Sequence, residues 1–201
     1  MRQKSQETRK RLLEVAAELF AEKGFNGAGV REICKLAKVN ISAISYHFGS
    51  KKALYIEVFK TYLAPAIEKI RQAFQKNLQQ KPKDLKGIVE ALAEAVLLTP
   101  IKEEQRKNIF SLLVKELTSE SELSKFVLKE VLNPLLTEFS KVVSPFFSSS
   151  KEVKFFVFSV VSQIMFFNFF RPWVSDVFGI PNYTPKFKEE IVKHIVEFST
   201  C

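Results

Sequence analysis

Histidine, cysteine and glycine are scarce in this chain, and their scarcity excludes several kinds of site. The sequence holds 2 His, 2 Cys and 6 Gly in 201 residues. The His and Cys residues lie far apart, so they do not form the clusters that bind zinc. The chain has no glycine-rich phosphate loop and no convincing set of nucleophile, base and orienting group. The sequence therefore predicts a protein that is not an enzyme and holds no metal or cofactor.

The few cysteines and the first residues also bear on cellular location. Cys34 lies on an apolar helix face and Cys201 is the last residue, so the two form no disulfide framework. The N-terminal stretch MRQKSQETRKRLL lacks the apolar core of an export signal. We therefore expect a cytoplasmic protein, with Cys34 in the core rather than acting as a redox sensor.

One strongly apolar run, Phe155–Phe170, raises the question of a membrane span. Four polar residues interrupt it and Arg171-Pro172 ends it, whereas a span needs about 20 mostly apolar residues. This pattern favours a buried helix. A membrane-associated helical protein is the less favoured alternative.

The charge of the chain is positive and unevenly spread. The net charge is +9. Residues 1–52 hold 11 Lys and Arg against 5 Glu, a net of +6, which leaves 20 bases against 17 acids, a net of +3, in the rest. A basic first quarter indicates a polyanionic partner, although a solvated basic surface would have the same composition.

Apolar residues recur with helical periodicity along the chain, which predicts an all-α fold. Loops are expected at 79–83 and 144–150. The long helix beginning at Lys51 should kink at Pro65, another helix contains Pro134, and the Phe-rich helix should kink at Pro172. The expected helices cover residues 5–23, 29–37, 41–48, 51–79, 84–98, 102–117, 121–143, 151–178 and 185–199.

The stretch from Ala28 to Lys52 has the pattern of two short helices joined by a tight break at residues 38–40. Asn40 is suited to cap the second helix, because its side-chain oxygen can accept a free backbone N–H. Ile44 and Phe48 can point inward from that helix. Its outward face is then small, polar and aromatic and has no acid, as a helix entering a DNA groove requires.

The segment GVREICKLAKVNISAISYHFGSKKALY resembles the DNA-binding domain of the TetR/AcrR family of bacterial transcriptional regulators. The most specific part runs from Val39 through the triplet Tyr46-His47-Phe48 to Lys51. The resemblance implies a three-helix head with a helix-turn-helix and a larger helical body for ligand binding and dimerisation, here residues 1–52 and 53–201. It also implies a homodimer formed through the helices near 151–178 and 185–199.

Two positions depart from the family pattern. Ala28-Gly29 stands where the family often has Thr or Ser, which removes a hydroxyl that would cap the second helix. Lys38 stands where the family often has Gly, which places a cation beside the turn.

The resemblance and the pattern together predict the residues that touch double-stranded DNA. Tyr46 and His47 have the family role of contacting phosphates. Lys51 begins a helix whose N-terminus already favours an anion. The remaining residues offer groups for phosphates, base edges or thymine methyls. The full predicted set is Arg31, Asn40, Ile41, Ser42, Ala43, Ser45, Tyr46, His47 and Lys51. Arg31 has the alternative of pairing with a Glu.

The body offers weaker candidates for an effector site. Asn168, Arg171 and His194 are polar groups within very apolar helices, and we predict that they orient a ligand; a role in structure or in the dimer interface fits the same pattern. The stretch Phe169–Trp173 resembles, more weakly, one subgroup of the family.

These observations predict a ligand-responsive transcriptional regulator, a repressor released from its operator by a hydrophobic or aromatic small molecule. An inducer-free architectural DNA-binding protein is the alternative. The sequence does not specify the effector, the operator or the regulated genes.

Overall fold

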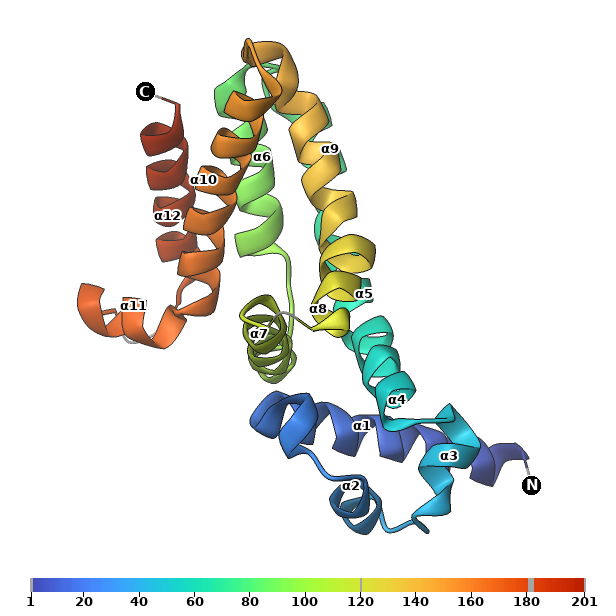
Figure 1. The fold of residues 1–201 in the computed structure, drawn as a ribbon. Helices are drawn as coiled ribbons and strands as arrows, with labels where there is room; N and C mark the ends of the chain where they lie inside the picture. The colour runs from blue at the N-terminus through green and yellow to red at the C-terminus, as the bar shows by residue number, and fades with distance from the viewer. Residues whose placement is uncertain (1, 120, 181–182, 201) are drawn as a thin grey trace. The chain divides into compact units, whose positions relative to one another are not determined.

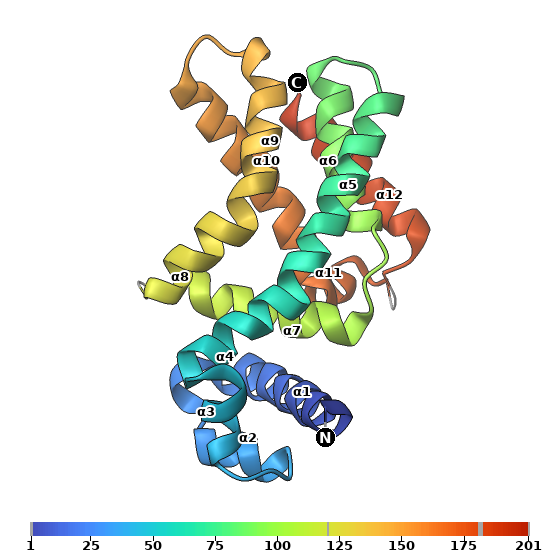
Figure 2. The same cartoon turned by 90° about the vertical axis from the view of Figure 1, so that its right-hand side faces the viewer.

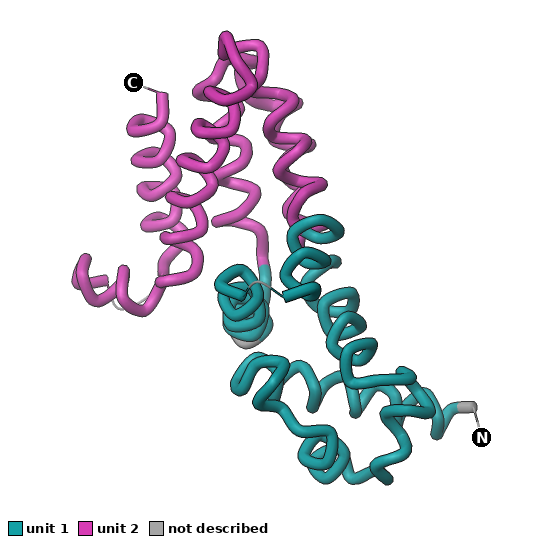
Figure 3. The backbone as a smooth tube through the Cα atoms, viewed as in Figure 1, with its two compact units in different colours: residues 1–66, 101–131 teal, residues 67–100, 132–201 magenta. Residues whose placement is uncertain are grey.

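A computed structural model describes residues 2–119, 121–180 and 183–200 (Figure 1). Every regular element among them is helical, so the all-α prediction is confirmed. Cys201 lies outside the described residues. The chain forms two compact units, residues 1–66 with 101–131 and residues 67–100 with 132–201 (Figure 3). The functional division at residues 52 and 53 is a separate matter and remains a prediction.

The first unit begins with α1 (Arg2–Gly27), which starts three residues earlier than expected. Gly24 has φ of +71°, a conformation that side chains disfavour, and it ends the regular helix as predicted. Short helices α2 (Val30–Leu36), α3 (Ser42–Phe48) and α4 (Lys51–Val58) follow. Phe20, Ile33 and Ile44 are buried as expected, whereas Phe48 is only half-buried.

The first unit also includes α7 (Glu103–Leu117) and α8 (Glu122–Phe126). Helix α7 packs against α1, and α8 packs against α7. Ser111 and Lys115 of α7 donate to the carbonyl of Ala21, and Lys115 Nζ lies 2.8 Å from the carbonyl of Glu22. These carbonyls belong to the last turn before Gly24, where helix carbonyls lack intrahelical donors. A cation at that end is also favoured by the helix dipole.

Two prolines are accommodated by π-helical segments rather than by simple kinks. The π segment η1 (Phe59–Leu63) precedes α5 (Ala64–Gln80), which has Pro65 in its first turn. A second, η2 (Val127–Leu132), precedes α9 (Asn133–Val143), which has Pro134 in the same place. Proline lacks the N–H of an α-helical bond and its ring meets the carbonyl four residues earlier, so the preceding turn widens. The irregularity expected at Pro65 thus takes the form of a π-helical segment just before it.

The second unit is built around α6 (Leu85–Leu98), which is buried on most of its surface. Its N-cap is Asp84, whose carboxylate accepts from Gly87 N at 2.7 Å. Helix α6 packs against α12 (Pro185–Ser199), α10 (Ser150–Phe169) and α9 (Figures 1 and 2). A 3-10 turn, η3 (Ser144–Phe146), lies between α9 and α10.

The Phe-rich segment differs from expectation in its burial. It divides at Phe170 into α10 and α11 (Arg171–Phe178), close to the expected break at Pro172. Helix α10 is long and apolar enough to cross a membrane, yet only 17% of its most apolar window is buried within the chain. Phe155 and Phe158 are 64% and 70% exposed. The chain therefore buries one face of α10 and leaves its aromatic face exposed.

Candidate nucleic-acid interface

The break between α2 and α3 is held by local hydrogen bonds. Lys38 adopts φ of +53°, the left-handed region where the family more often places glycine. Val39 N then donates to the carbonyl of Cys34 at 3.0 Å, which turns the chain back toward α3. The side chain of Asn40 accepts from Ser42 N at 3.0 Å, so it engages a free backbone N–H as predicted, although the N-cap position of α3 is Ile41.

The outward face of α3 matches the predicted division of its residues. Ile44 is 2% exposed and points into the core, while Tyr46 is 80% exposed and Ile41 is 49% exposed. Ala43 and His47 are half-buried. The His47 ring lies edge-on to the Tyr46 ring at 4.8 Å between centroids. The face is thus open to a partner and aromatic at its C-terminal end.

Acidic residues are excluded from this surface or neutralised at its edges. From Ile33 to Ile56 the sequence has no Asp or Glu. The acids that bound this stretch are both paired: Lys23 Nζ lies 2.5 Å from Glu32, and Arg9 Nη2 lies 2.5 Å from Glu57. The alternative of an Arg31–Glu pair is not seen, since in the described part of the chain Arg31 is exposed and has no ion pair.

Lys51 lies at the start of α4 in a partly desolvated place. Its ammonium lies 4.6 Å from the centroid of the Phe25 ring, and burial lowers its pKa from the ordinary value. Ser50 caps the helix by accepting from Ala53 N at 3.0 Å. An anion at this N-terminus would meet free backbone N–H groups and the ammonium together. Lys52 beside it is exposed and is not among the residues predicted to contact DNA.

Cys34 behaves as a core residue. It is 2% exposed, its thiol donates to the carbonyl of Ile41 at 3.8 Å, and burial raises its pKa. A thiol that remains protonated and covered is a poor redox sensor. Across residues 2–119, 121–180 and 183–200, no three His, Cys, Asp or Glu side chains converge as a metal site would require.

Two family models match the sequence that builds this geometry and the unit beyond it. The model of bacterial regulatory proteins of the tetR family matches residues 12–58. The model of the C-terminal domain of the HTH-type transcriptional dual regulator CecR matches residues 85–200, more than half of the chain. The chain belongs to the TetR/AcrR family of transcriptional regulators.

Individual curated relatives are similar to part of the chain. The transcriptional repressor NicS of Pseudomonas putida KT2440 is 40% identical over 58 residues, 29% of this chain and 27% of NicS. The transcriptional activator FasR of Mycolicibacterium smegmatis is 31% identical over 90 residues, 45% of this chain and 41% of FasR. The chain thus spans about a quarter to two fifths of the length of these relatives.

Solved TetR-family structures share the fold over nearly the whole chain. HlyIIR, a hemolysin II transcriptional regulator, superposes with a TM-score of 0.65 at 23% identity, covering 96% of this chain and 97% of its own. A TetR/AcrR-family regulator from Aquifex aeolicus VF5 gives 0.59 at 23% identity, covering 95% and 99%. At these identities the likeness establishes the fold alone.

The structure does not bring the three predicted effector residues together as one binding site. Arg171 Nη2 donates to Asn168 Oδ1 at 2.8 Å and its Nε donates to the Asn168 carbonyl at 3.1 Å, and both residues are buried. Arg171 also stacks over the Tyr183 ring at 4.7 Å. His194 is exposed on α12 between the rings of Phe167 and Phe198. This geometry gives Asn168 and Arg171 a structural role at the α10–α11 break, and their role toward an effector remains a prediction.

Proposed function

We propose that this TetR/AcrR-family chain is a homodimeric, cytoplasmic DNA-binding repressor that a small, mainly apolar molecule releases from its operator. The observation that supports this most directly is the outward face of the turn and α3. That face is exposed, has no acid, and is bordered by acids already paired with Lys23 and Arg9. Such a surface is suited to a phosphate backbone and a major groove.

The proposed division of labour on the DNA follows from where each side chain lies. Tyr46 and Lys51 would contact phosphates from the C-terminal end of α3 and the start of α4. Ile41 and Ala43 would present methyl groups to thymine. Ser42 differs from its neighbours, because its hydroxyl lies 3.0 Å from Asn40 Oδ1. With that bond kept, Ser42 can still accept through its hydroxyl oxygen and Asn40 can still donate from its amide NH2.

The proposed dimer is formed by the exposed aromatic faces of α10 and α12. Phe155, Phe158, Phe166 and Phe198 are 64%, 70%, 40% and 71% exposed in the single chain. Exposed rings that gather into one patch would mark an interaction site. Pairing with a second copy would cover it and would explain why α10 is apolar without being buried.

The direction of regulation is the part that rests on analogy. NicS is a repressor and FasR is an activator, and the CecR model describes a dual regulator. Repression requires that the DNA-bound state be the ligand-free one, and release requires that the effector prefer the other state. For a hundredfold loss of operator affinity the coupling must be about 2.7 kcal/mol.

The test begins with DNA selected from a random pool by the purified full-length protein. We expect an inverted repeat whose half-sites lie about 34–36 Å apart or a multiple of that spacing. Analytical ultracentrifugation of the complex should show an even number of chains. A single unrepeated footprint would contradict the dimer. Selected DNA whose affinity no apolar compound changes would favour the inducer-free architectural protein.

A further inference from the structure

A groove between α9 and α10 is lined by none of the residues predicted to contact DNA or an effector. Its volume is about 630 Å³, within the usual range of small-molecule sites. Both walls belong to the second unit. Its apolar lining includes Leu136 of α9 and, from α10, Val153, Val157 and Val161.

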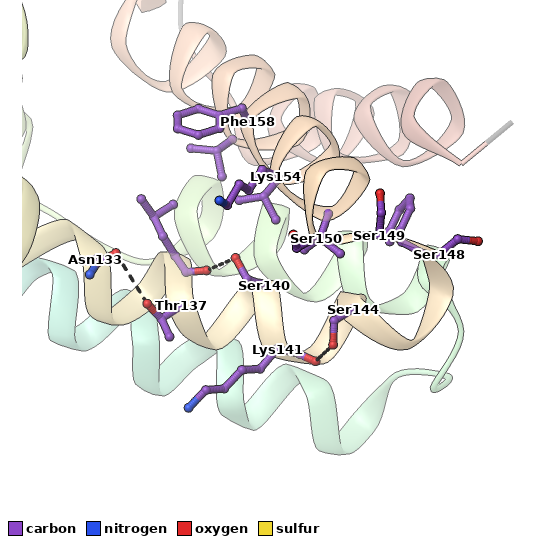
Figure 4. A pocket seen from close by; sticks show the side chains of 15 residues that line it. Asn133, Thr137, Ser140, Lys141, Ser144, Ser148, Ser149, Ser150, Lys154 and Phe158 are labelled. Atoms are coloured by element: carbon purple, nitrogen blue, oxygen red, sulfur yellow. Dashed lines mark hydrogen bonds between the residues drawn. The ribbon is translucent and has the colours of Figure 1, made fainter.

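The charged residues that line this groove are all basic. Lys141 and Lys154 line it, and none of the lining residues is Asp or Glu. Lys154 extends into the space between the two helices, whereas Lys141 extends away from α10 (Figure 4). Neither lysine has an ion pair in the part of the chain that the structure describes.

Acids on the same two helices are engaged elsewhere. Glu138 of α9 accepts from Gln75 at 2.7 Å and lies 3.4 Å from Arg71 Nη1. Glu152 of α10 accepts from Ser148 N at 2.9 Å. The Lys154 ammonium is therefore not matched by a carboxylate of its own surroundings.

The α9 hydroxyl of Ser140 and the hydroxyl of Ser144, which follows α9, are committed as donors. Ser140 donates to the carbonyl of Leu136 at 2.7 Å, and Ser144 donates to the carbonyl of Lys141 at 2.9 Å. A ligand anion needs donors, and these hydroxyls offer it mainly acceptor oxygens. Lys154 is thus the lining group best suited to an anion, beside an apolar wall.

We propose that this groove binds an amphiphile with one carboxylate and an apolar acyl tail. The carboxylate lies at Lys154 and the tail runs along Val153, Val157 and Val161, about 12 Å of helix at 1.5 Å per residue. This inference rests on the proposed function, in which the body binds a mainly apolar effector. It adds the charge of that effector and its location.

The experiment measures binding of three probes to the full-length protein by titration calorimetry, each below its micelle concentration. The probes are laurate, lauryl alcohol and dodecyltrimethylammonium, which share a tail and differ in charge. We expect laurate to bind tightest. Lys154→Ala should weaken laurate about tenfold, and Lys154→Glu should reverse the preference in favour of the cationic probe.

The matched control is Lys151→Ala on the same helix. Lys151 lies over the Phe155 ring at 5.8 Å and does not line the groove, so laurate affinity should not change. Equal affinity for laurate and the alcohol, or equal losses in Lys151→Ala and Lys154→Ala, would overturn the proposal. Lys154 is exposed, so both variants should fold, and their unfolding temperatures check this.

Operator binding separates this proposal from the proposed function. If the protein binds selected DNA but not laurate, the groove proposal fails and the regulator proposal stands. If laurate binds through Lys154 but no specific DNA is found, the groove proposal stands and the regulator proposal fails.

Discussion

The two compact units expose opposite kinds of surface. The first presents a small, polar, acid-free face on the turn and α3, and bonds from Tyr55 to Glu116 and from Lys115 to the Glu22 carbonyl join α4, α7 and α1. The second encloses α6 but leaves aromatic rings of α10, α11 and α12 in solvent. This difference indicates two kinds of partner. The polar face of the first unit suits a charged, hydrated partner. The exposed rings of the second unit suit a partner that covers them and excludes water.

The largest expected effect comes from placing a charge on the exposed aromatic face. Phe166 is 40% exposed and contacts the rings of Phe170 and Trp173. Phe166→Glu should cost the single chain little, but would bury an unpaired carboxylate in a dimer, at several kcal/mol. Sedimentation should show monomers or aggregated protein.

The control for this variant is Gln79→Glu. Gln79 is an exposed residue of α5, so the change adds the same charge to a helix outside the aromatic face. It should sediment as the unmodified protein does. If Phe166→Glu remained a soluble dimer, the interface would have to lie on another surface. The proposed contrast between the two units would then fail.

The next effect concerns the buried bonds of the first unit. Tyr55 donates from its hydroxyl to Glu116 at 2.6 Å, and Glu116 also accepts from Ser121 at 2.9 Å. Tyr55→Phe would leave the buried carboxylate short of a donor and should lower the free energy of unfolding by about 2 kcal/mol. Urea denaturation measures this. Tyr62→Phe, which changes a half-buried tyrosine with no hydrogen bond in the described chain, should cost much less.

A smaller effect is expected on DNA affinity. Lys51→Ala should weaken binding to all sequences about equally and reduce the slope of log K against log salt by about 1. Fluorescence anisotropy at several salt concentrations measures that slope. Lys60→Ala, an exposed lysine further along the same helical run, is the control and should leave it unchanged. An unaltered slope in Lys51→Ala would remove Lys51 from the contact surface.

The smallest effect tests the turn. Lys38 has φ of +53°, a conformation that costs a non-glycine residue about 1 kcal/mol. Lys38→Gly should relieve this cost and raise the free energy of unfolding by about 0.5 kcal/mol, after the greater chain entropy of glycine is counted. Lys35→Gly, inside α2, should instead lower it by about 1 kcal/mol. Thermal unfolding of the two variants should therefore shift in opposite directions.

Local chemistry explains which features the sequence predicted well. Gly24, Asp84 and Thr184 mark helix ends by conformational freedom or side-chain capping, which short segments of sequence specify. The alternation of inward Ile44 with outward Tyr46 on α3 follows from helical spacing in the same way.

The errors concern features that depend on more distant parts of the chain or on a partner. An apolar pattern does not reveal whether a helix is covered by its own chain or by another one, so the sequence did not specify that α10 is mostly exposed in the single chain. The pairing of Arg171 with Asn168 was open for a related reason: three residues of separation permit the contact, but the helix break at Phe170 decides it. The groove at Lys154 was missed because it combines two helices whose spacing the sequence does not specify.

The order in which the chain is synthesised constrains how the first unit can fold. Glu116, the partner of Tyr55, lies 61 residues downstream, and Lys115, which binds the end of α1, lies 94 residues after Ala21. At 5–20 residues per second, translation separates Tyr55 from Glu116 by roughly 3 to 12 s. During that interval Tyr55 lacks its partner Glu116, and the carbonyls of Ala21 and Glu22 lack the donors that α7 supplies. The N-terminal helices that have emerged before residues 111–116 would therefore form a less stable intermediate. Chaperones and proteases could act on this intermediate while the chain is still on the ribosome.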